Sequence, residues 1–193
     1  MSKDIQGNDV QAVRLPVTGG IAWAPVDAAN VITPAEGGDA ALKLLEDHPA
    51  YKPLGLLKTD GGYEQTVNST DATQFFQQGY KLAGDDTIGF KVALAQSDLD
   101  TLQWMMGVTF DKDHHAYREN AFNTGPFLVF HEVEYKNRDI TRRNGVAMIV
   151  NLDEDKDQRG SIKGYQATCE WIKSPLFNGS SFSQWEIPAP KEA

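Results

Sequence analysis

The strongest constraint on the fold is a strict alternation of apolar and other residues in several segments. Between residues 87 and 95 every second residue is Ile, Phe, Val or Leu, and residues 127–135 and 144–152 follow the same period. Because successive side chains of a strand point to opposite faces, this period is typical of β-strands. Weaker strand signals lie at 13–17, 20–24, 63–67 and 161–172.

The strand predicted over residues 87–95 leads directly into the clearest helix signal of the chain. Ser97 is the expected N-cap, and Gly107 is a suitable residue to end the helix. A second, short helix is expected from Asp39 to Leu45, with Asp39 as its N-cap.

These signals predict a mainly β fold, an antiparallel β-sandwich or barrel with one flanking α-helix and long loops. The loops are expected at residues 26–60 and 108–125. The predicted organisation is a flexible N-terminal arm (1–12), one β-sandwich domain (13–175) and an extended C-terminal arm (176–193).

Composition narrows the possible functions. The 193 residues carry a net charge of -9, and residues 1–125 hold 9 Lys and Arg against 17 Asp and Glu. Such a chain lacks the basic face that grips nucleic acid through its phosphates, but DNA could slide past it. The single cysteine, Cys169, excludes an intramolecular disulfide. No signal peptide and no membrane-spanning run is expected.

Two acidic or histidine-rich segments superficially resemble metal sites. His114, His115 and Glu119 lack the spacing of the helical zinc motif, so a solvated loop is expected there. The run of alternating aspartates at residues 153–157 begins like a calcium loop, but Gln158 stands where that loop needs glycine. A charged hairpin turn is expected instead, and no metal or cofactor is predicted.

Catalytic groups do not converge in the sequence pattern. On a strand, His131 faces opposite to Glu132 and Glu134, so acid–base work by these three is not expected. Cys169 lies in the middle of a predicted strand on an apolar face, where thiols are normally inert. The chain is therefore expected not to be an enzyme.

Arg142-Arg143 is the centre of the only basic cluster, with Lys136 and Arg138 nearby. It is expected either to meet the acidic part of a neighbouring copy or to form a solvated turn.

The order of these segments resembles the major tail tube proteins of long-tailed, non-contractile bacteriophages. The resemblance covers roughly residues 15–175. It is carried by Trp23-Ala24-Pro25, Leu54-Gly55-Leu56-Leu57-Lys58-Thr59-Asp60-Gly61-Gly62, the alternating strand Thr87–Ala95, the helix ending at Gly107, the strand Phe127–Lys136 and the pair Arg142-Arg143. The sequence departs from the family at Phe75-Phe76-Gln77-Gln78, where tryptophan or glycine is expected.

The resemblance implies two packed antiparallel sheets with a flanking helix, similar to the type VI secretion tube protein. It implies rings of six subunits that stack into a hollow tube, through which double-stranded DNA passes without specific binding. The implied partners are other copies of the chain and the tape-measure, tail initiator and tail terminator proteins. The implied location is the virion tail, with assembly in the host cytoplasm and no membrane insertion.

Under this interpretation, particular residues are candidates for subunit contacts and for the lumen. The candidate interface residues are Leu54, Gly55, Asp60, Gly61, His114, His115, Arg142 and Arg143. The candidate lumen-facing acids are Glu64, Asp85 and Asp86. An acidic lumen would repel phosphates, and unpaired strand edges would meet neighbouring copies in a ring.

Three alternatives remain at this point. The first is a β-sandwich module that binds carbohydrate or protein through an exposed aromatic platform, supplied by Trp23, Trp104, Trp171 or Trp185. The second is a small enzyme that uses the His114-His115 loop. The third is a related phage part, such as a tail terminator or head–tail connector.

Overall fold

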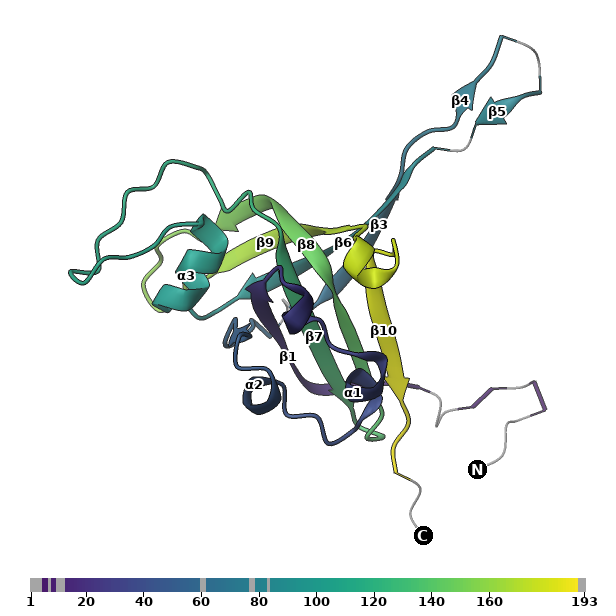
Figure 1. Cartoon of the computed structure of the whole chain (residues 1–193), viewed down its shortest axis with the longest axis horizontal. Helices are drawn as coiled ribbons and strands as arrows, with labels where there is room; N and C mark the ends of the chain where they lie inside the picture. The colour runs from purple at the N-terminus through teal and green to yellow at the C-terminus, as the bar shows by residue number, and fades with distance from the viewer. Residues whose placement is uncertain are drawn as a thin grey trace.

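The computed structural model describes residues 5–6, 8–9, 13–59, 62–76, 79–82 and 84–190 (Figure 1). The fold is mainly β and antiparallel, as predicted. The strands are β1 (Pro16–Pro25), β2 (Lys52–Pro53), β3 (Glu64–Ser69), β4 (Thr73–Gln74), β5 (Lys81–Leu82), β6 (Asp86–Leu94), β7 (Phe127–Tyr135), β8 (Ile140–Glu154), β9 (Tyr165–Ile172) and β10 (Phe182–Ile187). The helices are η2 (Ala28–Asn30), α1 (Pro34–Gly38), α2 (Leu44–Asp47), α3 (Leu99–Met106) and η3 (Pro175–Phe177).

The main sheet has the order β2-β1-β7-β8-β9-β6-β3, and β10 also pairs with β8. Ile172, the last residue of β9, lies opposite Val146, and Phe182, the first residue of β10, lies opposite Gly145. β9 and β10 therefore continue one another along a single edge of β8. The prediction of an extended C-terminal arm over 176–193 is wrong for residues 182–187, because they pair within this sheet.

Residues 52–58 join the two ends of the sheet and close it into a barrel. On one side, β2 pairs with β1, and the Leu54 N–H donates to the Ile21 carbonyl at 2.9 Å. On the other side, the Lys58 N–H donates to the Ala93 carbonyl at 2.9 Å, just past the end of the β3–β6 pairing. The same short segment thus contacts both β1 and β6.

The strands bury apolar side chains on both faces. Inside the barrel, Phe127 and Val129 of β7 pack with residues of β6, β8 and β9 and with Trp104 of α3. The alternate residues of β7, Leu128 and Phe130, belong to a second cluster outside the barrel. Each face of this strand is therefore buried, which explains why its apolar signal is the longest in the chain.

A buried amide holds the 26–51 segment on the outside of the barrel. The Asn144 side chain donates to the Tyr51 hydroxyl at 2.8 Å and accepts from the Ile32 N–H at 3.2 Å. Tyr51 in turn donates to the Asn30 carbonyl at 2.9 Å. Since every polar atom in this contact has a partner, the segment is fixed to the sheet at several points.

The helix predicted from Asp39 to Leu45 is absent. The Asp39 side chain accepts from the Ala41 N–H and forms a local turn, while α1 lies before it and α2 begins only at Leu44. The first α-helix begins instead at Pro34. Its N-cap is Thr33, whose side chain forms a capping box with that of Glu36.

The helix α3 confirms the expected position with one correction. Its N-cap is Asp98 and not Ser97, since the Asp98 carboxylate accepts the Thr101 N–H at 2.8 Å. Gly107 ends the helix in the left-handed conformation, with φ of 67°, as the sequence predicts.

Two segments project from the barrel body (Figure 1). The hairpin of β3 and β6 continues outward to the small β4–β5 ribbon at its far end. The segment of residues 108–126 forms a long loop on the other side of the molecule and contains no helix or strand, which confirms the loop expected at 108–125.

Candidate assembly interface

The far end of the projecting hairpin exposes large apolar side chains. We call this the tip: residues 73–76 and 79–82. Phe76 is fully exposed, Tyr80 is 69% exposed and Leu82 is 60% exposed. An apolar group of this size on a narrow ribbon is a feature of surfaces that contact another molecule.

Strand edges that lack a partner lie next to one another at the base of the hairpin. Among the described residues, β3 pairs only with β6, and β1 pairs with β2 only at Ala22 and Trp23. The outer edge of β3 and the first half of β1 therefore offer backbone N–H and C=O groups to another strand.

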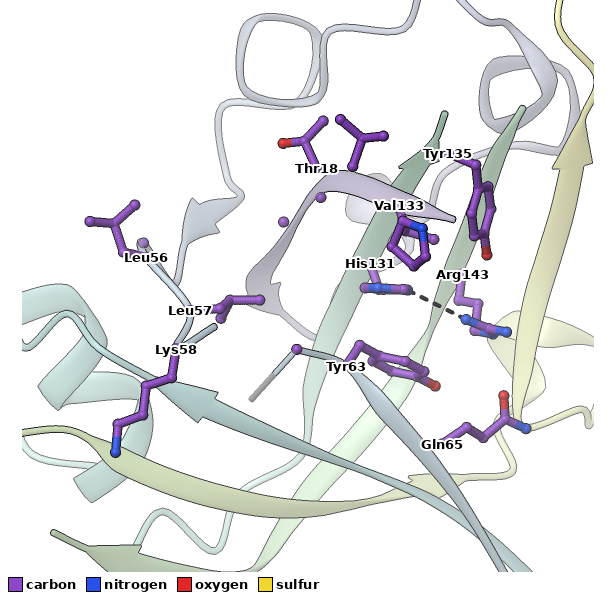
Figure 2. Close-up of a pocket in the computed structure, with 16 residues that line it drawn as sticks. Thr18, Leu56, Leu57, Lys58, Tyr63, Gln65, His131, Val133, Tyr135 and Arg143 are labelled. Atoms are coloured by element: carbon purple, nitrogen blue, oxygen red, sulfur yellow. Dashed lines mark hydrogen bonds between the residues drawn. The ribbon is translucent and has the colours of Figure 1, made fainter. Parts of the chain in front are cut away.

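A groove of about 620 Å³ lies between these two edges (Figure 2). One wall is residues 16–20 of β1, and the other is residues 55–58 together with Gly62, Tyr63 and Gln65. Its floor is the last part of β7, His131, Val133 and Tyr135, with Arg143 of β8. The groove is thus the place where the barrel wall is incomplete.

Three side chains stack across the floor of the groove. The rings of Tyr63 and His131 are nearly parallel, with centroids 4.0 Å apart, and the Arg143 guanidinium lies 5.0 Å from the Tyr63 centroid. An Arg143 Nη1–H group points to Nδ1 of His131 at 3.5 Å. Figure 2 shows the three from three different parts of the sheet. Burial, together with the Arg143 charge, lowers the pKa of His131 to about 3, so the ring is neutral near pH 7.

Arg143 is half-buried and keeps its positive charge without a carboxylate partner. Its Nε donates to the Gln184 side chain at 2.9 Å, and none of the ion pairs in the described part of the chain includes it. A guanidinium is well suited to a carboxylate, so this cation offers a binding position for one.

Arg142 does not belong to a surface basic cluster, contrary to the sequence interpretation. Its side chain is 1% exposed, pairs with Glu132, and donates to the carbonyls of Gly37 and Asp39. Since β8 alternates its side chains between two faces, only Arg143 of the pair faces the groove.

The other candidate interface residues are scattered. Leu54 is fully buried in the barrel interior, so it is not available as a contact of the folded subunit. Gly55 lines the groove. His114 and His115 are exposed in the 108–126 loop. Asp60 and Gly61 lie outside the described residues.

The three candidate lumen acids all lie on the hairpin and are exposed. Glu64 is the first residue of β3 and lies opposite Lys91, whereas Asp86 is the first residue of β6 and lies opposite Ser69. The register places Glu64 and Asp86 on opposite faces of the ribbon, because they are an odd number of positions apart in the ladder. Asp85 lies just outside the ladder, where its N–H donates to the Thr70 hydroxyl at 2.8 Å.

The four tryptophans do not form an exposed platform. Trp104 and Trp171 are buried, and Trp23 and Trp185 are half-buried. The indole of Trp185 packs against Gly37 and donates to the Pro34 carbonyl at 3.1 Å. The tryptophans that a carbohydrate-binding module would expose therefore pack within this fold.

The side chains of β7 and β9 lie on the faces that the strand period predicts. His131 and the carboxylates of Glu132 and Glu134 are on opposite faces of β7, and Cys169 is fully buried in the barrel interior. Within the described ranges, no three His, Cys, Asp or Glu side chains form a group that could hold a metal ion.

Comparison with known proteins finds no family whose model matches the chain, and no curated protein matches it significantly. In the part of the chain that the structure describes, no helix is both long enough and apolar enough to cross a membrane.

The groove and the tip were not identified as sites from the sequence. The aromatic pair Phe75-Phe76 within a polar segment was a usable signal, since two large apolar residues there have no period that would bury them. The groove had no such signal, because its residues come from four separate segments that meet only in the folded barrel.

Proposed function

We propose that this chain is a structural subunit of a phage tail tube, which assembles into stacked rings of six and forms the conduit for DNA delivery. The observation that carries the proposal is the projecting hairpin with its exposed apolar tip. A compact barrel has no need of such an arm for its own stability, because the tip contributes nothing to either core cluster.

The unpaired edges support the same function. Exposed edges are a liability in a monomer, since they template contacts with other chains. In a closed ring each exposed edge contacts a neighbouring subunit, so the edges form the subunit interface. Within the described residues, the outer edges of β3, of β10 and of the first half of β1 pair with no further strand and are available for such contacts.

The charge of the hairpin suits a wall that DNA passes. Between residues 64 and 87 the chain has Glu64, Asp71, Asp85 and Asp86 against the single cation Lys81. Because Glu64 and Asp86 lie on opposite faces of the ribbon, one wall receives only part of this charge. Negative charge on an inward surface disfavours phosphate contacts, whereas a basic surface would retain DNA by counterion release. The proposed partners beyond the chain itself are the tape-measure, tail initiator and tail terminator proteins.

Electron microscopy of the concentrated protein tests this function. Stacked rings with a central hole are expected from the wild-type chain, and a Phe75→Ser/Phe76→Ser variant is expected to form far fewer of them. As a control, Gln158→Ser/Arg159→Ser changes two exposed residues in the turn between β8 and β9, away from the hairpin and outside the candidate interface residues. Assembly into solid fibres or amorphous aggregates, without a central hole, would contradict the proposal.

A further inference from the structure

The groove and the tip are complementary surfaces of one chain that lie at different places in the molecule. We propose that the groove receives the hairpin tip of a second copy, and that this head-to-tail contact is the repeated bond of the assembly. The inference rests on the proposed function in assuming that copies of the chain associate.

The backbone geometry favours a strand as the occupant. The groove lies between β1 and β3, two neighbouring edges that have no strand between them in the described part of the chain. Strand addition to an open edge supplies main-chain hydrogen bonds, and side-chain pockets supply specificity. A narrow two-stranded ribbon such as β4–β5 presents an edge of this kind.

The side chains match in polarity. The groove floor presents the ring of Tyr63, which is stacked on the buried ring of His131, together with Val133. The tip presents Phe76 and Tyr80, which are largely exposed and belong to neither core cluster of the described residues. Aromatic rings that stack or meet edge to face stabilise such a contact beyond the area they bury.

The charges match as well. Arg143 faces the groove without an ion-pair partner, and the hairpin near the tip carries the exposed carboxylates of Asp71, Asp85 and Asp86. A carboxylate from the second copy would neutralise Arg143 where Tyr63 and His131 partly shield it from water. The neutral state of His131 prevents a second positive charge from opposing Arg143 at neutral pH.

The contact cannot form within one chain. Gln65 in the groove and Phe75 at the tip are ten positions apart in the chain, which in extended strand corresponds to roughly 33 Å. Figure 1 shows the ribbon directed away from the barrel. A tip that binds a groove elsewhere on the surface gives a heterologous contact, and such contacts produce closed rings or open filaments.

Two half-blocked variants test the inference. The tip-blocked variant is Phe75→Ser/Phe76→Ser, which keeps an intact groove. The groove-blocked variant is Gln65→Trp/Arg143→Glu, which keeps an intact tip and changes only exposed or half-buried side chains. Thermal unfolding establishes that each variant folds. Sedimentation velocity is then measured for each alone, for an equimolar mixture, and for the wild-type chain.

Each variant alone is expected to remain monomeric, and the mixture is expected to form a one-to-one dimer that grows no further. A charge reversal tests the ion pair. An Arg143→Glu chain should bind a partner that carries Asp85→Lys/Asp86→Lys in its tip at least about tenfold more tightly than it binds a partner with an unchanged tip. If the wild-type chain assembles and either folded variant assembles equally well, the groove–tip contact is wrong while the proposed function stands. If the wild-type chain itself never assembles, the proposed function fails.

Disulfide trapping gives an independent readout. Cys169 is fully buried, and burial raises the pKa of its thiol, so it does not compete in the reaction. Phe76→Cys in one copy and Gln65→Cys in another are expected to form a mixed disulfide under mild oxidation. The control pair is Phe76→Cys with Ser161→Cys, an exposed position in the β8–β9 turn. Equal yields from the two pairs would overturn the inference.

Discussion

Arg142 and Arg143 are adjacent in sequence, yet their side chains lie on opposite faces of β8 and have opposite environments. Arg142 is buried against Glu132 and the carbonyls of Gly37 and Asp39. Arg143 faces the groove beside Tyr63 and His131. The pair therefore places one guanidinium in the interior and the other in the groove, where a second molecule can reach it.

Arg142→Met is expected to lower the free energy of unfolding by about 3 kcal/mol, because it leaves two carbonyls and a carboxylate without their donor. Arg143→Met, the matched control, is expected to cost less than about 1 kcal/mol, since its side chain is half-buried and has no ion-pair partner. Urea denaturation of both variants measures the difference. Equal losses would contradict the assignment of Arg142 to the interior.

The start of α3 gives a second paired test. Asp98→Ala is expected to lower the unfolding free energy by about 1 kcal/mol, because the Thr101 N–H loses its acceptor. Ser97→Ala is expected to change it by less than about 0.5 kcal/mol, since Ser97 is exposed and does not cap the helix. Thermal unfolding of the two variants distinguishes the two candidate N-caps. A larger loss of unfolding free energy in Ser97→Ala than in Asp98→Ala would show that Asp98 is not the N-cap.

His131 makes stability depend on pH. Its pKa falls from 6.5 in the unfolded chain to about 3 in the fold, so the unfolded state binds the extra proton between these values. The neutral ring makes its full contribution to the free energy of unfolding above pH 6.5. As the pH falls below 6.5 this contribution is lost, at up to about 1.4 kcal/mol per pH unit. Denaturation between pH 5.5 and 6.5 measures this slope above the range in which most carboxylates titrate.

The variant His131→Phe keeps a flat ring over Tyr63 and removes the proton site. It is expected to flatten the dependence on pH in this window while the exposed-site control His115→Phe retains it. An unchanged slope in His131→Phe would show that another group is responsible.

The Asn144–Tyr51 contact is expected to hold the 26–51 segment on the barrel. Tyr51→Phe removes one hydroxyl and should cost about 1 kcal/mol, and Asn144→Ala removes three hydrogen bonds and should cost about 3 kcal/mol. The double variant is expected to lose less than the sum, because the residues share a bond. Limited proteolysis should cut within residues 26–51 faster in Asn144→Ala; additive losses would contradict the coupling.

Local patterns predicted the elements that depend on local geometry. The strand at residues 127–135 and the helix ending at Gly107 follow from the periods of two and 3.6 and from a glycine in the left-handed conformation. The helix α1 was also predictable, because Thr33, Pro34 and Glu36 form a recognisable start signal. The prediction placed a helix later because Asp39 is equally suited to a turn.

Contacts between distant segments were not predictable in this way. Leu54 lies in a Gly- and Pro-punctuated segment, and only the pairing of residues 52–58 with both β1 and β6 buries it. A bulge between Ile149 and Asn151 changes the register of β8, so Val150 is exposed although it shares the apolar period of Val146. Arg142 has no sequence signal of burial, because the two carbonyls that it binds, those of Gly37 and Asp39, lie about a hundred residues away.

The central claim is that the chain assembles through its hairpin into rings of six, and native mass spectrometry of the wild-type chain tests it most directly. The protein is taken to high concentration in a salt that strengthens apolar contacts, which favours assembly, and is then diluted briefly before measurement. Species whose masses correspond to six chains and to multiples of six are expected, and these species should be lost in Phe75→Ser/Phe76→Ser. A wild-type population that contains only monomers, or only closed dimers, would contradict it.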